Sequence, residues 1–194
     1  MKDWTGNSKS LFVYNGDSNH SEKIRAELDY YATPPEMAEK LLELEPELKN
    51  IWECACGEGH LGKIFEKHNI LSKASDIVDR GYGEVIDFLS YEKNWNGDVV
   101  TNPPYNKAQE FVEHALDITE KGNKICMFLK LTFLEGKKRK KLFERGNLKT
   151  VYVSTSRVNC AYNGKFDGSS SAVAYAWFVF ENGYKGNPTI KWFN

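Results

Sequence analysis

An apolar run that ends at two prolines constrains the fold of this chain more than any other stretch. Residues 98–100 (Asp-Val-Val) read as a buried strand. Pro103 and Pro104 must end it, because proline cannot donate to the hydrogen-bond ladder of a sheet. Asn106 is then expected to cap a helix whose apolar residues recur at helical spacing: Ala108, Phe111, Val112, Ala115 and Leu116. The pattern predicts an α/β unit whose turn lies at the carboxyl end of a strand, where open α/β sheets bind ligands.

The side chains of this turn suit a planar amine. Asn102 offers an amide carbonyl as acceptor, and the carbonyl of Pro103 is held rigidly by the ring of Pro104. Tyr105 offers a flat face on which a base can stack, a task that needs the ring and not the hydroxyl. The same four residues could form only a turn after a strand, and a short motif is decided by its context.

Length and composition allow one domain with a sizeable core, because the chain has 194 residues of which 41% are hydrophobic. The net charge of -1 gives no global basic field, so any contact with nucleic acid requires a local patch. The four cysteines lack the spacing of a disulfide framework, which favours a reduced, cytoplasmic protein. No apolar run approaches ~20 residues, so we expect no membrane span, and the first residues open no signal segment.

Two boundaries follow from the distribution of polar residues. Residues 1–29 are rich in Asn, Ser and Gly, and we expect an N-terminal arm that packs on the body or orders with a ligand. Residues 30–194 are expected to form a single domain. Within it, Thr33 and Glu36 have the spacing of a capping box and Pro34 fits a first helical position. The N-terminus of such a helix is a natural anion site.

A strand, a glycine turn and a helix start are predicted over residues 50–61. Gly57 and Gly59 would let a ligand approach the backbone closely, although a lone G-x-G is weak evidence. Asp76 ends the next strand about 20 residues later, where an acid can bind ribose hydroxyls. A metal site at Cys54 and its neighbours is disfavoured, because a C-x-C lacks zinc spacing.

Two later stretches could contact a substrate. Residues 124–134 read as a strand covered on both faces, and a basic run from Lys137 to Lys141 follows it. This run is either a solvated helix face or a phosphate contact beside the site. The loop that starts at Arg157 and ends at Ser171 is long and rich in Asn, Gly and Ser, which is typical of functional loops.

Taken together, four motifs in one order resemble the DNA N6-adenine methyltransferases, which use S-adenosylmethionine. The motifs are residues 33–36 (Thr-Pro-Pro-Glu), 53–59 (Glu-Cys-Ala-Cys-Gly-Glu-Gly), 87–89 (Asp-Phe-Leu) and 102–105 (Asn-Pro-Pro-Tyr). Their order resembles the gamma arrangement of that family, and the likeness covers residues 30–180. Cys54 stands where the family usually has proline. The whole chain also resembles small methyltransferases carried by phages and prophages.

The resemblance implies a Rossmann-like class I methyltransferase fold with helices on both faces of a mostly parallel sheet of about seven strands. A late strand over residues 174–180 would be antiparallel. The implied reaction transfers a methyl group from S-adenosylmethionine to an exocyclic amino nitrogen, with N6 of adenine in DNA favoured and no metal needed. A duplex adenine would have to flip out of the helix. A homodimer or an accessory specificity partner stays open.

The resemblance also assigns roles to single residues. Thr33 and Glu53 would hold the methionine end of the cofactor, Asp76 its ribose, Ile77 its adenine ring and Asp87 its exocyclic amine. The full cofactor set is Tyr31, Thr33, Pro34, Glu53, Ala55, Gly57, Gly59, Asp76, Ile77, Asp87, Phe88 and Asn102. The catalytic set is Asn102, Pro103, Pro104 and Tyr105.

One departure from the family leaves the acceptor open. The family usually carries a target-recognition domain after the core, and here we expect none, with only a short stretch around Trp192 and Phe193 in its place. Recognition would then fall to the N-terminal arm, to the loop from Arg157 or to a partner. The alternatives are methylation of RNA adenine or of a protein glutamine amide, and a non-catalytic cofactor-binding or interaction module. A nicotinamide oxidoreductase is disfavoured by the incomplete glycine fingerprint.

Overall fold

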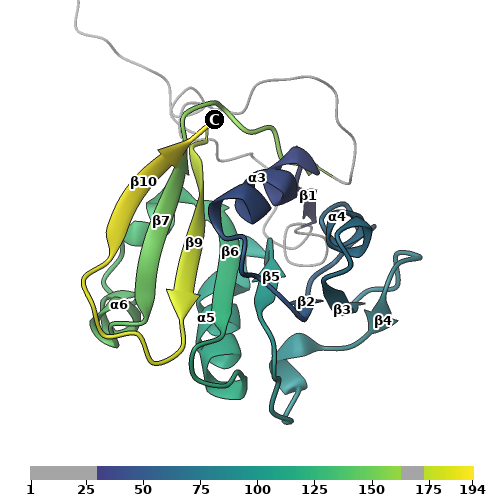
Figure 1. The fold of residues 1–194 in the computed structure, drawn as a ribbon, viewed down its shortest axis with the longest axis horizontal. Coiled ribbons are helices and arrows are strands. Elements are labelled where there is room, and N and C mark those ends of the chain that lie inside the picture. Colours follow the sequence, from purple (N-terminus) through teal and green to yellow (C-terminus); the bar gives the residue numbers. More distant parts are fainter. Residues whose placement is uncertain (1–29, 163–172) are drawn as a thin grey trace, which may run out of the picture.

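The computed structural model describes residues 30–162 and 173–194, and an eight-stranded sheet forms its centre (Figure 1). The order across the sheet is β10-β7-β9-β6-β5-β2-β3-β4. The strands are β2 (Ile51–Glu53), β3 (Leu71–Asp76), β4 (Glu84–Val85), β5 (Val99–Thr101), β6 (Lys124–Lys130), β7 (Leu148–Ser154), β9 (Tyr175–Glu181) and β10 (Thr189–Phe193). The expected arm over residues 1–29 lies outside the described residues.

The sheet is parallel except for β9, which pairs antiparallel with both β6 and β7. The expected mostly parallel α/β sheet is confirmed, and so is the antiparallel strand near residues 174–180. The sheet has eight strands and not seven. The two-residue edge strand β4 adds to the count, because it is too short to show an alternating pattern.

Helices cover both faces of the sheet, as expected. Alternate residues of β6 point to opposite faces, because successive side chains of a strand alternate. Met127 joins the core cluster of α5 (Ala108–Ile118) and α6 (Lys140–Glu144). Phe128 joins the cluster of α3 (Glu36–Leu44) and α4 (Gly62–Lys67). Both side chains are fully buried, which explains the near-continuous apolar run in the sequence.

A second, two-stranded sheet lies apart from the main one. In it β1 (Tyr31–Ala32) pairs antiparallel with β8 (Ala161–Tyr162). This pairing joins the segment that precedes α3 to the segment that follows β7. It therefore fixes residues 30–33 beside the carboxyl ends of the central strands.

The predicted cap at Asn106 is wrong. A 3-10 turn, η2 (Tyr105–Lys107), precedes α5, and Lys107 is the residue that flanks the helix. The carbonyl of Pro104 accepts from the backbone N–H of Lys107 at 2.9 Å, which closes this turn before the α-helix begins.

The predicted capping box is also wrong. The helix α3 starts at Glu36 after Pro35, which already has helical angles, and no side chain caps it. Thr33 lies too far upstream to reach the free N–H groups, and Pro34 precedes the helix instead of opening it. Two prolines with preset φ replace the side-chain cap.

The strand expected over residues 124–134 ends earlier than predicted, at Lys130. A 3-10 turn, η3 (Leu131–Leu134), follows it, and another, η1 (Phe88–Ser90), follows β4. Within the two described ranges, no helix is long and apolar enough to cross a membrane.

A buried ion pair holds the amino end of β6 to the end of α3. Lys124 is 5% exposed and Glu45 6% exposed, and their side chains form a salt bridge. The hydroxyl of Tyr152 donates to the other carboxylate oxygen of Glu45 at 2.6 Å. Burying two charges is favourable only when both find partners, and these do.

We expect Lys124→Ala to lower the free energy of unfolding by ~3–5 kcal/mol, because Glu45 would remain buried without its cation. The control is Lys40→Ala, which removes an exposed pair with Glu43 and should cost under ~1 kcal/mol. The double variant Lys124→Met with Glu45→Met should recover at least half of the loss. Urea unfolding measures all three, and a Lys124→Ala loss equal to the control would contradict the account.

Candidate active site

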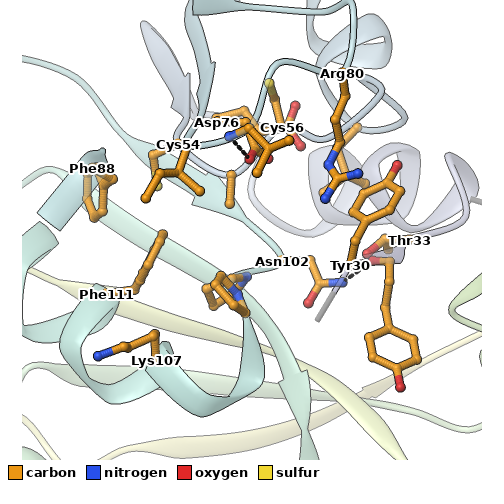
Figure 2. A pocket seen from close by; sticks show the side chains of 18 of the residues that line it. Tyr30, Thr33, Cys54, Cys56, Asp76, Arg80, Phe88, Asn102, Lys107 and Phe111 are labelled. Carbon is orange, nitrogen blue, oxygen red and sulfur yellow. Dashed lines mark hydrogen bonds between the residues drawn. The ribbon is translucent and has the colours of Figure 1, made fainter. Parts of the chain in front are cut away.

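A cavity of about 390 Å³ opens at the carboxyl ends of β2, β3 and β5 (Figure 2). Its walls come from segments that are far apart in the sequence. The lining residues are Tyr30, Tyr31, Ala32, Thr33, Glu53, Cys54, Ala55, Cys56, His60, Leu61, Asp76, Ile77, Val78, Arg80, Ile86, Asp87, Phe88, Leu89, Asn102, Pro103, Pro104, Tyr105, Asn106, Lys107 and Phe111. The fold thus gathers three of the predicted motifs and Thr33 around one space.

Most of the residues predicted from the sequence lie on this cavity. All four residues of the Asn-Pro-Pro-Tyr turn do. Of the predicted cofactor residues the cavity is lined by Tyr31, Thr33, Glu53, Ala55, Asp76, Ile77, Asp87, Phe88 and Asn102. Pro34, Gly57 and Gly59 are not among the lining residues.

Aromatic rings, and not the cavity, occupy the space beside the two glycines. Gly57 and Gly59 have φ angles of +55° and +80°, which side chains other than glycine rarely adopt. A Cβ atom at Gly57 would collide with the ring of Tyr30, and one at Gly59 with the ring of Tyr82. The glycine turn therefore makes room for two tyrosine rings, of which that of Tyr30 lines the cavity.

Asp76 ties the glycine turn to the end of β3. Its Oδ2 accepts from the backbone N–H of Gly57 at 2.8 Å, and its Oδ1 accepts from that of Val78 at 3.0 Å. Next to it Ile77 is 65% exposed although it is apolar. A carboxylate beside an uncovered apolar side chain suits a ligand with hydroxyls and a flat ring.

Asp87 and Phe88 are held by their own short turn. The carboxylate of Asp87 accepts from the backbone N–H of Leu89 at 3.0 Å and from the hydroxyl of Ser90 at 2.9 Å. Phe88 is buried, and its ring centroid lies 5.0 Å from that of Phe111 on α5. Phe88 and Phe111 thus form an aromatic wall of the cavity, and the carboxylate of Asp87 lies beside it.

Glu53 carries a buried oxygen with no partner. The side chain is 2% exposed at the end of β2, and its Oε2 has no hydrogen bond. Burial raises the pKa of this carboxyl well above its usual value, the N–H of Gly62 opposes the shift, and the charge of Asp76 adds to it. Such a group gains from a cationic ligand that donates to it.

Asn102 is held at one end of its amide only. Its Nδ2 donates to the backbone carbonyl of Tyr31 at 2.9 Å, which fixes the plane of the side chain. Its Oδ1 is buried and has no hydrogen-bond partner. The side chain therefore presents one oriented acceptor at the cavity.

Tyr105 is held at its hydroxyl as well as by its ring. The hydroxyl donates to that of Tyr175 at 3.1 Å, a contact that no pattern in the sequence indicates. The ring centroid lies 5.4 Å from that of Tyr31, and Nζ of Lys130 lies 4.8 Å from the Tyr105 centroid. Burial raises the pKa of the Tyr105 hydroxyl well above its usual value, so it stays protonated as a donor.

Several lining residues were not found from the sequence. Tyr30, His60 and Arg80 reach the cavity through tertiary contacts that leave no periodic pattern. Cys56 also lines it, but burial first, and then the charges of Glu53 and Asp76, raise its pKa to about 12. No group of three His, Cys, Asp or Glu side chains within residues 30–162 and 173–194 is placed to hold a metal ion.

The basic run does not line the cavity. Arg139 folds back onto the chain, with its Nε donating to the carbonyl of Glu135 at 2.8 Å and its guanidinium over Phe133. Lys140 lies 3.5 Å from Glu144 on the same helix turn. Residues 163–171 of the loop that starts at Arg157 fall outside the described part of the chain.

The fold is similar to that of solved methyltransferases. A protein of Listeria monocytogenes assigned to the class I S-adenosylmethionine-dependent methyltransferases has a TM-score of 0.58 at 14% identity, over 95% of this chain and 71% of that one. The M protein of the type I restriction enzyme EcoKI has a TM-score of 0.54 at 15% identity, over 95% and 51%. An S-adenosylmethionine-dependent O-methyltransferase of Thermotoga maritima has a TM-score of 0.53 at 9% identity, over 81% and 69%.

These likenesses establish the fold at low sequence identity. No family model matches the chain, and no curated protein matches it. The chain spans 71% of the first structure and about half of the EcoKI protein. Because one fold can host many different reactions, the fold alone does not determine the methyl acceptor. The protein has the Rossmann-like α/β fold of the class I methyltransferases.

The raised pKa of Glu53 makes the stability of the folded protein depend on pH. The ordinary pKa of a glutamate carboxyl is 4.5, so at a pH above 4.5 Glu53 loses its proton in the unfolded chain but keeps it in the folded protein, where its pKa is raised. The free energy of unfolding therefore falls as the pH rises towards the folded pKa. We expect Glu53→Gln, which cannot ionise, to remove this fall, so that its stability relative to wild type grows from about pH 4 to about pH 8.

Urea unfolding at a series of pH values measures this difference. The matched control is Glu92→Gln, which removes an exposed carboxylate and should give a curve parallel to that of the wild type. A parallel curve for Glu53→Gln as well would mean that Glu53 ionises alike in the folded and unfolded chains.

Proposed function

We propose that this protein is an S-adenosylmethionine-dependent methyltransferase that acts on an exocyclic amino nitrogen, with N6 of adenine in DNA as the favoured acceptor. The observation that carries the proposal is the amide of Asn102. Its nitrogen is bound to the carbonyl of Tyr31 and its buried Oδ1 lacks a partner. An oriented acceptor at the end of β5 fits an N–H donor better than a hydroxyl oxygen that must lose its only proton.

The residues of the turn supply the chemistry. The amino group of adenine is a poor nucleophile, because its lone pair is conjugated with the ring. Asn102 would accept a hydrogen bond from one N–H of this amino group and the carbonyl of Pro103 would accept from the other, which would draw the two N–H bonds out of the ring plane and localise the lone pair on nitrogen. The carbonyl of Pro104 is engaged by Lys107. Among the described residues, no backbone N–H group in a turn or loop donates to the carbonyl of Pro103.

The residues around the cavity fit the cofactor. When bound, S-adenosylmethionine supplies a methyl group on a positively charged sulfur. The unpartnered Oε2 of Glu53 would accept from the ammonium group of the methionine part. Asp76 would bind the ribose hydroxyls, Ile77 would pack on the adenine ring, and Asp87 would accept from the cofactor's exocyclic amine. Thr33 would contact the methionine end.

Two further features favour nucleic acid as the substrate. Tyr105 presents a ring at the cavity, and a base stacked on an aromatic ring gains ~1–3 kcal/mol. Among the similar structures is the M protein of a type I restriction enzyme. Residues 137–141 and the loop from Arg157 would then add contacts to phosphates, and a second copy or a specificity partner would extend them.

We expect Asn102→Ala to lower kcat by ~10²–10³, as for the loss of one preorganised contact to the transition state. Affinity for S-adenosylhomocysteine should change little, because Asn102 mainly meets the acceptor. The control Asn94→Ala, an exposed residue before β5, should behave as wild type. Methyl transfer from labelled cofactor to separate pools of DNA, RNA and protein measures the effect. Full activity of Asn102→Ala on every pool would rule out this mechanism, and labelling of only RNA or protein would replace DNA as the acceptor.

The basic run gives a separate prediction. Neutralising Lys137, Lys138 and Lys141 together should flatten the plot of log affinity for duplex DNA against log salt. The slope should fall by up to ~0.9 for each lysine that contacts a phosphate. Fluorescence anisotropy with a labelled duplex measures the slope. A slope equal to that of the wild type would make the run a solvated face.

A further inference from the structure

Arg80 is a charged residue of the cavity that the proposed reaction leaves unused. It follows β3, is half-buried and lines the site. Its Nε is buried without a hydrogen-bond partner, and no ion pair with another described residue is recorded for it. A guanidinium has five N–H donors, and leaving buried donors unpaired is costly. The side chain is therefore suited to an anionic ligand in the cavity.

Tyr30 holds the guanidinium in place. The guanidinium carbon lies 4.4 Å from the Tyr30 ring centroid, and Figure 2 shows Arg80 above this ring, with Thr33 beside Tyr30. The Tyr30 hydroxyl accepts from the backbone N–H of Glu58 at 3.2 Å. Gly57 leaves the space that the ring fills. A guanidinium stacked on a fixed ring keeps its plane and leaves its edges free to donate.

The other charged residues of the cavity are less suited than Arg80 to bind a carboxylate. Glu53, Asp76 and Asp87 suit the cationic and hydroxyl groups of S-adenosylmethionine, but none of them carries a positive charge that could attract its single carboxylate. Lys107 is 3.8 Å from Glu110, and in Figure 2 it lies on the side of the cavity away from Arg80.

His60, which also lines the cavity, supplies little positive charge. Burial lowers its pKa, and Lys63 adds to that effect while Glu58 opposes it. The neutral form of His60 is therefore favoured near neutral pH.

On the basis of the proposed function, we propose that Arg80, stacked on Tyr30, binds the carboxylate of the methionine part of the cofactor. The two oxygens of a carboxylate match the paired N–H groups of a guanidinium. Thr33 and Glu53 would then share the methionine end with Arg80. Glu53 would bind the ammonium group of the methionine part, and Arg80 would bind its carboxylate.

Two ligands that differ in the methionine tail test the proposal. S-adenosylhomocysteine carries the carboxylate, whereas 5′-methylthioadenosine keeps the nucleoside and lacks the tail. Arg80→Ala should weaken binding of S-adenosylhomocysteine about 10- to 100-fold, the range for a lost charge-assisted hydrogen bond. Its affinity for 5′-methylthioadenosine should stay within about twofold, which also shows that the variant is folded. Arg80→Lys should be intermediate, because it keeps the charge and loses the paired donors.

Isothermal titration calorimetry measures both affinities without any acceptor substrate. The matched control is Lys67→Ala, which removes a cation that pairs with Glu39 on the surface and should bind both ligands as wild type. Equal losses for the two ligands, or no loss for either, would overturn the role of Arg80. So would unchanged cofactor affinity with weakened DNA binding, which would make Arg80 a phosphate contact. If the wild type binds neither ligand, the proposed function itself fails.

Discussion

The structure depends on strands that are buried on both faces. Both β6 and β9 are covered by α5 and α6 on one side and by α3 on the other, so almost every side chain along them is apolar. A charged group placed mid-strand would have neither water nor a partner. Polar chemistry is therefore confined to the strand ends, and the parallel arrangement brings the ends of β2, β3 and β5 to one edge.

Buried polar groups have different roles at the amino ends and at the carboxyl ends of the central strands. At the amino end of β6, Lys124 pairs with both Glu45 and Glu47, and the hydroxyl of Tyr152 donates to Glu45. At the carboxyl edge, Glu53 and Asn102 each keep a buried oxygen unpartnered. Buried polar groups at the amino ends of the strands therefore stabilise the fold, whereas those at the carboxyl ends keep oxygen atoms that can accept hydrogen bonds from a ligand.

How much could be predicted from the sequence follows from the range of each interaction. Strand ends marked by Glu53, Asp76 and Asn102 are local signals, and the structure places all three on one cavity. The caps expected at Asn106 and Thr33 failed because neighbouring prolines changed where each helix begins. These errors moved a helix start by a few residues but did not move the site.

Other parts of the site depend on contacts between distant segments. Arg80 stacks on Tyr30, and the hydroxyl of Tyr105 meets that of Tyr175 on β9. Neither pair shares a periodic pattern or a motif, because each forms only when the sheet has assembled. Composition and spacing could therefore indicate which residues line the cavity, but not which contacts hold its walls in place.

The bond between Asn102 and the main chain at Tyr31 has a consequence for how this site can change. Its acceptor is a peptide carbonyl, which every amino acid carries, so no replacement of the side chain at position 31 removes it. The orientation of the Asn102 amide is set by the path of β1, and β1 is held by its pairing with β8. Turning the Asn102 amide while keeping this bond would therefore require a shift of the two-stranded ribbon, and not only the change of a neighbouring side chain.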